Sequence, residues 1–131
     1  KKPDYDILNG VHYKIGNIQG ELDLVVLNKA TNQVEHIVEV KCQKDIPRSA
    51  RKARKQLRRF QKGLEWAFSQ EERLGQYFTL AQIKFRIKNY RLNLAQFRSP
   101  HLKFSTYLFS NDSGKEQLSR RQLEVLLRMF E

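Results

Sequence analysis

Cysteine is nearly absent from the sequence, which contains only Cys42 among its 131 residues. A single thiol cannot form an internal disulfide, and it cannot supply the set of thiolates that a cysteine-based zinc site needs. Proteins without disulfides are typical of reducing compartments, so we expect an intracellular protein of the cytoplasm or the nucleus. We expect Cys42 itself to pack as a small apolar side chain.

Long apolar runs are missing as well. No stretch approaches the roughly 18 consecutive apolar residues of a membrane span, so we expect no membrane partner. No signal peptide is visible in these residues, and they contain no internal repeat and no Gly-rich phosphate loop. The length of 131 residues and the apolar content of 40% suit a single domain over residues 1–131. Because the chain does not begin with Met, we expect it to be a fragment of a longer protein with other domains.

Acidic residues are scarce: 14 Asp and Glu stand against 25 Lys and Arg, which gives a formal net charge of +11. Such an excess of one sign favours a polyanionic partner. The imbalance is concentrated between Lys44 and Lys62, where nine basic residues accompany one acidic residue and supply +8 of the total. This concentration predicts a binding surface within that stretch.

The same stretch predicts an amphipathic helix of about 20 residues, or about 30 Å. Pro47 and Ser49 are residue types that often begin helices. Apolar residues recur at spacings of three and four and form one stripe, made of Ala50, Ala53, Leu57, Phe60, Leu64 and Phe68. The rest of the helix is strongly basic and carries Arg48, Arg51, Lys52, Lys55, Arg58, Arg59 and Lys62. We interpret this basic side as a face that binds a nucleic-acid backbone, and the alternative is a solubilising surface.

Two predicted apolar strands carry charged residues within them or at their ends, namely Asp23, Glu39 and Lys41. Apolar strands seldom contain such residues. Leu24 to Leu27 and Ile37 to Val40 have strand length and many β-branched residues, and the polar link between them predicts a hairpin. With the turn centred on Thr31, Asp23 lies opposite Glu39. A shift of one residue would break this pairing, because it would turn every side chain of one strand to the other face.

Directly opposed side chains have Cβ atoms about 4.5–5.5 Å apart, and two carboxylates at about 5 Å repel each other by about 3 kcal/mol at an effective dielectric of about 20. We therefore expect Asp23 and Glu39 to hold either a proton or a cation between them. Mg²⁺ favours one or two carboxylates together with waters and phosphate oxygens. Lys41 shares a face with Glu39, where it can orient an attacking water. The alternative is an ordinary salt-bridged cluster on a solvated sheet face.

Three short motifs, in order, resemble the PD-(D/E)xK nuclease superfamily: GELD at 20–23, EVK at 39–41, and a helix that carries Ala53 and Gln56. The resemblance covers Val11 to Phe68, close to half of the chain. It implies an α/β protein of the restriction-endonuclease-like fold, with a central mixed sheet flanked by helices. It also implies hydrolysis of phosphodiester bonds with Mg²⁺ or Mn²⁺, DNA being the commonest substrate and RNA the alternative.

The resemblance also assigns roles by position. Asp23 and Glu39 would be metal ligands, with the main-chain carbonyl of Val40 as a further ligand. Lys41 would be the catalytic lysine. Gln56 would match a helix glutamine that some branches of the superfamily place beside the active site.

Two features depart from the family pattern. Leu22, not proline, precedes Asp23, a change that many members tolerate. The helix with a glutamate that many members place before the first strand is either absent or was cut away. Some members have lost catalysis, so a nucleic-acid-binding module without chemistry is the alternative function. A protein-interaction domain whose basic face meets an acidic protein is a third. Many relatives act as dimers, which makes a homodimer one expected assembly, and the motifs leave the choice between endonuclease and exonuclease open.

The rest of the chain completes a predicted sheet of four strands. The first strand is interrupted by a turn signal at Asn9-Gly10. Residues 77–97 fit a strand or a helix, and the lack of Gly and Pro favours a helix. Leu102 to Ser110 predicts the fourth strand. A capping box at Ser119 to Gln122 predicts a short closing helix.

Overall fold

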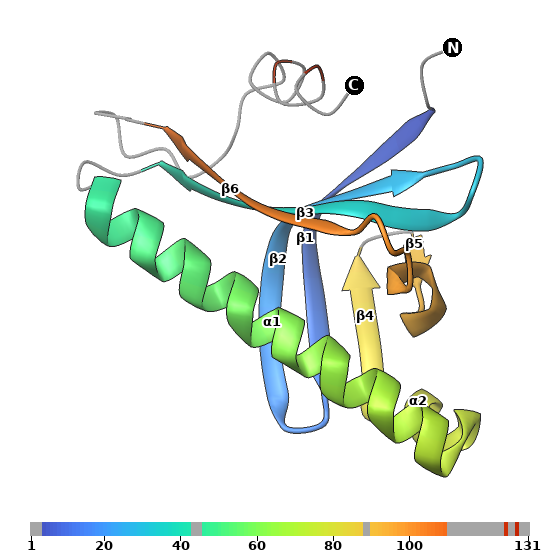
Figure 1. Ribbon diagram of the computed structural model, residues 1–131. Coiled ribbons are helices and arrows are strands. Elements are labelled where there is room, and N and C mark those ends of the chain that lie inside the picture. Colours follow the sequence, from blue (N-terminus) through green and yellow to red (C-terminus); the bar gives the residue numbers. More distant parts are fainter. Residues whose placement is uncertain (1–3, 43–45, 88–89, 110–124, 126–127, 129–131) are drawn as a thin grey trace.

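The computed structural model describes residues 4–42, 46–87, 90–109, 125 and 128 (Figure 1). Its strands form one mixed sheet in the order β5-β4-β1-β2-β3-β6, in which β3 and β6 are parallel and the other neighbours are antiparallel. The strands are β1 (Tyr5–Ile15), β2 (Ile18–Asn28), β3 (Gln33–Cys42), β4 (Ile83–Ile87), β5 (Tyr90–Leu92) and β6 (Lys103–Phe109). The helices are α1 (Ile46–Leu74), α2 (Gln76–Gln82) and the 3-10 helix η1 (Leu94–Phe97). The predicted α/β class and the mixed sheet are confirmed.

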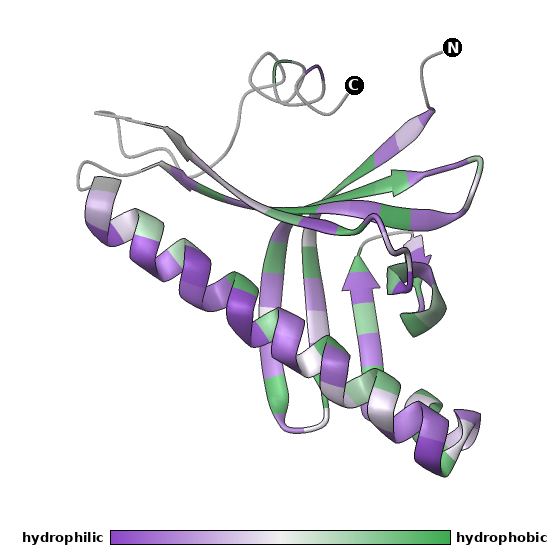
Figure 2. Ribbon diagram, viewed as in Figure 1, coloured by the Kyte–Doolittle hydropathy of each residue, from purple (hydrophilic) through white to green (hydrophobic). Residues whose placement is uncertain are grey.

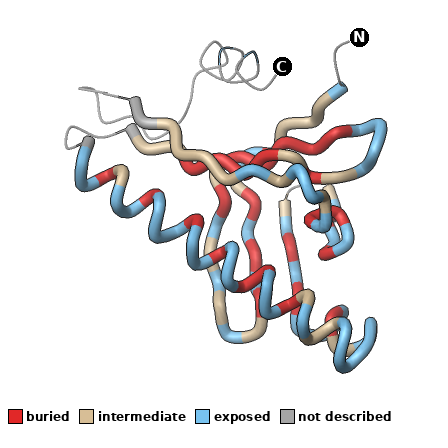
Figure 3. Tube along the Cα trace, in the orientation of Figure 1, coloured by how far each residue is buried: buried red, intermediate tan, exposed pale blue. Residues whose placement is uncertain are grey.

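The main core lies between α1 and one face of the sheet. The predicted apolar stripe is buried at Ala53, Leu57, Phe60 and Leu64. The Phe60 ring is central, with its centroid 4.8 Å from that of Tyr13, 6.3 Å from Phe85 and 5.8 Å from Phe97. Figure 3 shows buried and exposed residues alternating along α1, and Figure 2 shows that much of the helix is hydrophilic. Full burial of one Phe side chain stabilises a fold by about 1.5–3 kcal/mol, so this stripe anchors the helix.

A two-residue turn closes the hairpin of β1 and β2. Ile15 pairs with Ile18, and Gly16 adopts φ +58, the left-handed conformation that a tight hairpin turn needs at its first central residue. The indole of Trp66 from α1 covers this turn, because a Cβ on Gly16 would lie 3.1 Å from Trp66 Cη2. The Trp66 ring also meets Phe78 edge to face, at a centroid distance of 6.2 Å. Trp66 therefore holds the hairpin tip against the helices.

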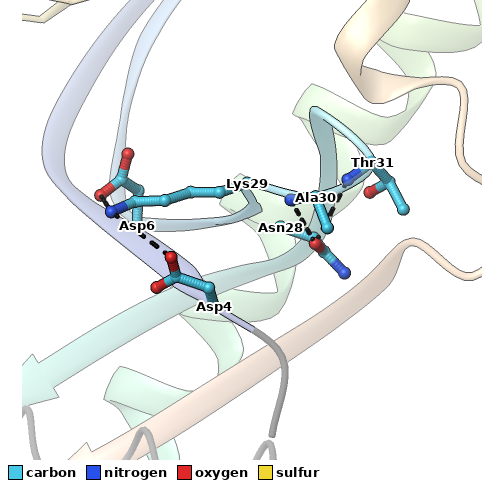
Figure 4. A network of polar contacts seen from close by, with 6 residues as sticks. All are labelled: Asp4, Asp6, Asn28, Lys29, Ala30 and Thr31. Atoms are coloured by element: carbon cyan, nitrogen blue, oxygen red, sulfur yellow. Dashed lines mark hydrogen bonds and ion pairs between the residues drawn. The ribbon is translucent and has the colours of Figure 1, made fainter. Parts of the chain in front are cut away.

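A network of polar contacts holds the turn between β2 and β3 (Figure 4). The side-chain oxygen of Asn28 accepts hydrogen bonds from the backbone N–H of Ala30 and of Thr31, at 2.9 Å and 3.4 Å. The ammonium group of Lys29 lies 3.3 Å from a carboxylate oxygen of Asp6 and 3.9 Å from one of Asp4. This loop is thereby tied to the start of β1.

A β-bulge sets the register between β2 and β3. Next to the turn Leu27 pairs with Val34, but the following pair is Val26 with His36, so Glu35 is left as an extra residue. The Glu35 carboxylate accepts hydrogen bonds from the Tyr5 hydroxyl and from the amide group of Asn28, each at 2.9 Å. Beyond the bulge the register is the predicted one. It arises because the bulge adds one residue to β3, and not because the turn is centred on Thr31.

The expected helix over 77–97 is wrong. This stretch forms α2, β4, β5 and η1 in turn. Buried Ile83 and Phe85 alternate with exposed Lys84 and Arg86, as in a strand with one buried face. Pairing of β4 with β1 thus overrides the helical periodicity that the same residues also satisfy. The predicted four-stranded sheet is corrected to six strands, because β4 and β5 extend it beyond β1.

Other expected boundaries also change. Asn9-Gly10 is not a turn, since β1 runs through it without a break. Helix α1 has 29 residues and stops where Gly75 adopts φ +87. The strand expected over 102–110 is β6, at the edge of the sheet, while the capping box at Ser119 to Gln122 and its closing helix lie outside the described residues. Within the described ranges, no helix combines the length and the apolar character needed to cross a lipid bilayer.

Candidate functional site

Asp23 lies at a distortion shared by β1 and β2. Leu22 and Val25 both pack in the main core, although a regular strand would point residues three apart to opposite faces. Gly10 lies across from Asp23 between regularly paired positions and adopts φ +66, a conformation that favours glycine. The sheet therefore changes direction at the level of Asp23.

Strand β3 separates from β2 at the same level. The pairing of β2 with β3 ends at Leu24 and Val38, whereas β3 stays paired with β6 as far as Cys42. Figure 1 shows the hairpin of β1 and β2 running toward the bottom of the view, while β3 and β6 continue to the left. Strands β2 and β3 thus diverge beyond Leu24 and Val38, and we call this point of divergence the fork. Helix α1 passes beside it.

At the fork, backbone N–H groups of β2 and β3 donate hydrogen bonds to two side-chain carboxyl groups instead of to backbone carbonyl groups. A carboxylate oxygen of Asp23 accepts a hydrogen bond from the backbone N–H of Val40 at 2.8 Å. A carboxylate oxygen of Glu39 accepts one from the backbone N–H of Asp23 at 3.4 Å. Each side chain thus replaces a backbone acceptor on the opposite strand. The predicted approach of Asp23 and Glu39 is what the structure shows.

Glu39 is the buried member of the pair, with 1% of its surface exposed. Burial and the adjacent Asp23 charge raise the pKa of Glu39 to about 8, and the charge of Lys41 opposes the shift. At neutral pH the Glu39 carboxyl therefore keeps a proton unless a cation replaces it. A solvated sheet face is excluded as its setting.

Lys41 lies two residues further along β3, half-buried and on the same face as Glu39. Within the described part of the chain it forms no ion pair with Asp23 or Glu39, although its charge acts on Glu39. Val40, between them, points to the opposite face, where its side chain packs against the small cluster of Leu24 and Val38. The ordinary salt-bridged cluster that was the alternative is not what the structure shows.

Tyr13, on β1, interacts electrostatically with Glu39 and was not among the predicted site residues. Its pKa is raised, chiefly by burial, with the positive charge of Arg59 opposing this and the charge of Glu39 adding to it. Its hydroxyl oxygen lies only 2.5 Å from where a Cβ on Gly20 would be, so glycine leaves room for it. Pairing across the turn at Gly16 places Tyr13 opposite Gly20, and that turn signal could have revealed the contact.

The basic side of α1 is exposed as predicted at Arg48, Arg51, Lys52, Lys55, Arg58, Arg59 and Lys62. Arg54 is exposed as well and belongs to the same set, although the helical projection did not single it out. Gln56 is also exposed on α1. Within the described residues, its side chain makes no hydrogen bond to Asp23 or Glu39.

The donor set suits a hard divalent cation that keeps several of its waters. Mg²⁺ is typically bound through one or two carboxylates plus substrate phosphates, and two carboxylates meet here. Across the described residues, no group of three or more His, Cys, Asp or Glu side chains is arranged to hold a metal ion. The pair of Asp23 and Glu39 therefore fits Mg²⁺ or Mn²⁺ better than a structural zinc site, which needs four side-chain ligands.

Comparisons with protein-family models, with curated proteins and with solved structures found no match for this chain.

Proposed function

We propose that this protein is a metal-dependent nuclease that hydrolyses phosphodiester bonds of DNA, with RNA as the alternative substrate. We propose further that it is a divergent member of the PD-(D/E)xK superfamily, with the restriction-endonuclease-like fold, and that it acts inside the cell. The observation that carries the proposal is the buried carboxyl of Glu39 beside Asp23, at a fork between two strands. Burying one carboxyl group beside a second carboxyl group is costly, and a bound cation would offset that cost.

Asp23 and Glu39 would hold Mg²⁺ or Mn²⁺, with the main-chain carbonyl of Val40 as a further ligand. When bound, the ion would polarise the phosphate and lower the pKa of a coordinated water. The raised pKa of Glu39, about 8, means that metal binding must displace a proton from this carboxyl. The site should therefore load more readily as the pH rises toward 8.

Lys41 would act on the attacking water and on the charge that develops on the phosphate. Its position two residues beyond Glu39 on the same face of β3 supports this role. Gln56 would contribute only if it contacts the substrate, because it is exposed and makes no hydrogen bond to the carboxyl pair. The exposed basic side of α1 would hold the nucleic-acid backbone beside the fork.

Cleavage of a substrate panel would test the proposal. Single-stranded, duplex and branched DNA and RNA are incubated with the protein, with Mn²⁺ and with EDTA. We expect Mn²⁺-dependent cutting that falls at least 100-fold in Asp23→Asn, Glu39→Gln and Lys41→Met. Glu72→Gln, on the exposed surface of α1, is the matched control and should cut at the wild-type rate. Wild-type cutting by all three site variants would overturn the assignment.

A nucleic-acid-binding module without chemistry is the second candidate. One observation favours it: both carboxyl groups already accept backbone hydrogen bonds, so they have a structural task without any metal. This candidate predicts salt-sensitive binding of nucleic acid, no heat of Mn²⁺ binding in calorimetry, and no cutting of any substrate in the panel.

A further inference from the structure

A second basic surface lies on the face of β1, β2, β4 and β5 that points away from α1. Tyr13 and Phe85 of these strands pack against Phe60 of α1, so their neighbours along each strand point the other way. The side chains on that outer face are all exposed and are His12, Lys14, Gln19, Glu21, Lys84, Arg86 and Arg91. We call these seven residues the outer basic face.

Residues of like charge are paired directly across strands on this face. Lys14 pairs with Lys84, and Arg86 pairs with Arg91. Directly opposed residues have Cβ atoms about 4.5–5.5 Å apart, and like charges in such pairs destabilise a sheet. The chain therefore keeps these cations at some cost to its own stability.

Counter-charges on the protein are few. Glu21 contributes the one acidic side chain of the outer basic face, and its carboxylate lies 4.0 Å from an imidazole nitrogen of His12. In the described part of the chain, Lys14, Lys84, Arg86 and Arg91 form no ion pair. Four cationic side chains are therefore available to an anionic ligand.

The outer basic face is also hollowed. A hollow of about 570 Å³ lies over β1, β2 and β4 and is lined by His12, Lys14, Gln19, Glu21, Lys84 and Arg86, together with Tyr13 and Gly20. Successive outward residues on a strand are about 6.6–6.8 Å apart, and adjacent strands lie about 4.7–4.9 Å apart. The cations thus form a two-dimensional array, which matches a chain of phosphates better than it matches one small anion.

We infer that the outer basic face is a second nucleic-acid-binding surface. It binds the phosphodiester backbone of a nucleic-acid strand at a position distant from the fork. The inference rests on the proposed nucleic-acid substrate but not on cleavage. The array of cations supplies charge for several phosphates. Contacts to phosphates carry no sequence information, so we expect binding there to be independent of base sequence.

Equilibrium binding of a fluorescent oligonucleotide, followed by fluorescence anisotropy, tests the inference. The measurement is repeated at NaCl concentrations from about 50 to about 200 mM, over which the release of counterions strongly lowers affinity. We expect Lys14→Glu/Arg86→Glu to weaken binding at least tenfold and to make the dependence on salt less steep. The control Arg73→Glu/Lys103→Glu changes the net charge equally at exposed positions outside both basic surfaces, and it should change the affinity less than threefold.

Lys84→Gln separates a binding role from a folding defect. Because it relieves the repulsion with Lys14, it should raise the thermal unfolding midpoint while it weakens binding. Wild-type affinity and salt dependence in both outer-face variants would overturn the inference, and so would a face that binds vesicles of anionic lipid but not the oligonucleotide. Cleavage is measured in parallel. Absence of metal-dependent cutting in the wild type would refute the nuclease proposal, whereas the inference about the outer basic face depends only on the binding measurements.

Discussion

At the scale of single residues, Glu39 is the most informative side chain of the protein. It is fully buried, it is next to a second carboxyl group, and it takes a hydrogen bond from the backbone of the opposite strand. A group in this setting is more stable with a proton than without one. The protonation of Glu39 can therefore be tested by the pH dependence of stability, and its proposed catalytic role by the cleavage assay.

Glu39→Gln should change how stability depends on pH. The folded-state pKa of about 8 lies above the ordinary value of 4.5, so between these values the folded protein holds a proton that the unfolded chain releases. The contribution of Glu39 to stability is therefore highest below pH 4.5 and falls as the pH rises to 8, by at most about 1.4 kcal/mol per pH unit. Glutamine resembles the protonated acid and does not titrate.

The measurement is urea unfolding of wild type and Glu39→Gln at four pH values across this window. We expect the variant to gain stability over the wild type as the pH rises, and Glu72→Gln to follow the wild type. A constant difference between wild type and Glu39→Gln would show that the carboxyl titrates normally.

At the scale of elements, the bulge in β3 decides which side chains meet. With regular pairing from the turn onward, Val38 would lie opposite Asp23. The extra residue, Glu35, moves Glu39 into that place and is itself held by Tyr5 and Asn28. Irregularities of this kind depend on interactions with a third strand, here β1, and not on the hairpin sequence alone.

Two length changes in β3 should have opposite outcomes. Deleting Glu35 removes the bulge but keeps Val26 opposite His36, so the Asp23–Glu39 pairing survives. The loss of its hydrogen bonds should cost about 1–2 kcal/mol of unfolding free energy. Inserting an alanine after His36 instead turns Glu39 to the other face and should abolish cutting. Urea unfolding and the cleavage assay together measure both effects, and equal activity of the two variants would contradict the register argument.

Charge reversal on α1 should act on binding and leave the chemistry at the fork intact. Arg51→Glu/Arg58→Glu is expected to weaken oligonucleotide binding about tenfold or more. The slope of log K against log salt should become shallower by about 0.7–0.9 for each phosphate that the protein no longer neutralises. Arg73→Glu, in the last turn of the same helix, is the control. An unchanged slope in the double variant would assign the basic side of α1 a solubilising role.

At the scale of the whole molecule, a bound cation should stabilise the fold because it links β2 to β3 where their backbone pairing has stopped. A ligand at ten times its dissociation constant that binds only the folded state stabilises by about 1.4 kcal/mol. Mn²⁺ should therefore raise the unfolding midpoint of the wild type, and more at pH 8 than at pH 6, because Glu39 must lose its proton. Glu39→Gln should lose most of this stabilisation, and an equal shift in both proteins would place the ion elsewhere.

The sequence by itself determined the features that depend on local periodicity and on charge. The apolar stripe and the basic side of α1 and the two acid-bearing strands all follow from spacing along the chain. Only the tertiary structure decided that residues 83–87 extend the sheet, that the bulge at Glu35 brings Glu39 to Asp23, and that Glu39 is buried. The physical reason is that strand pairing and burial bring distant segments together, and a local pattern compatible with helix or strand does not specify which segments meet.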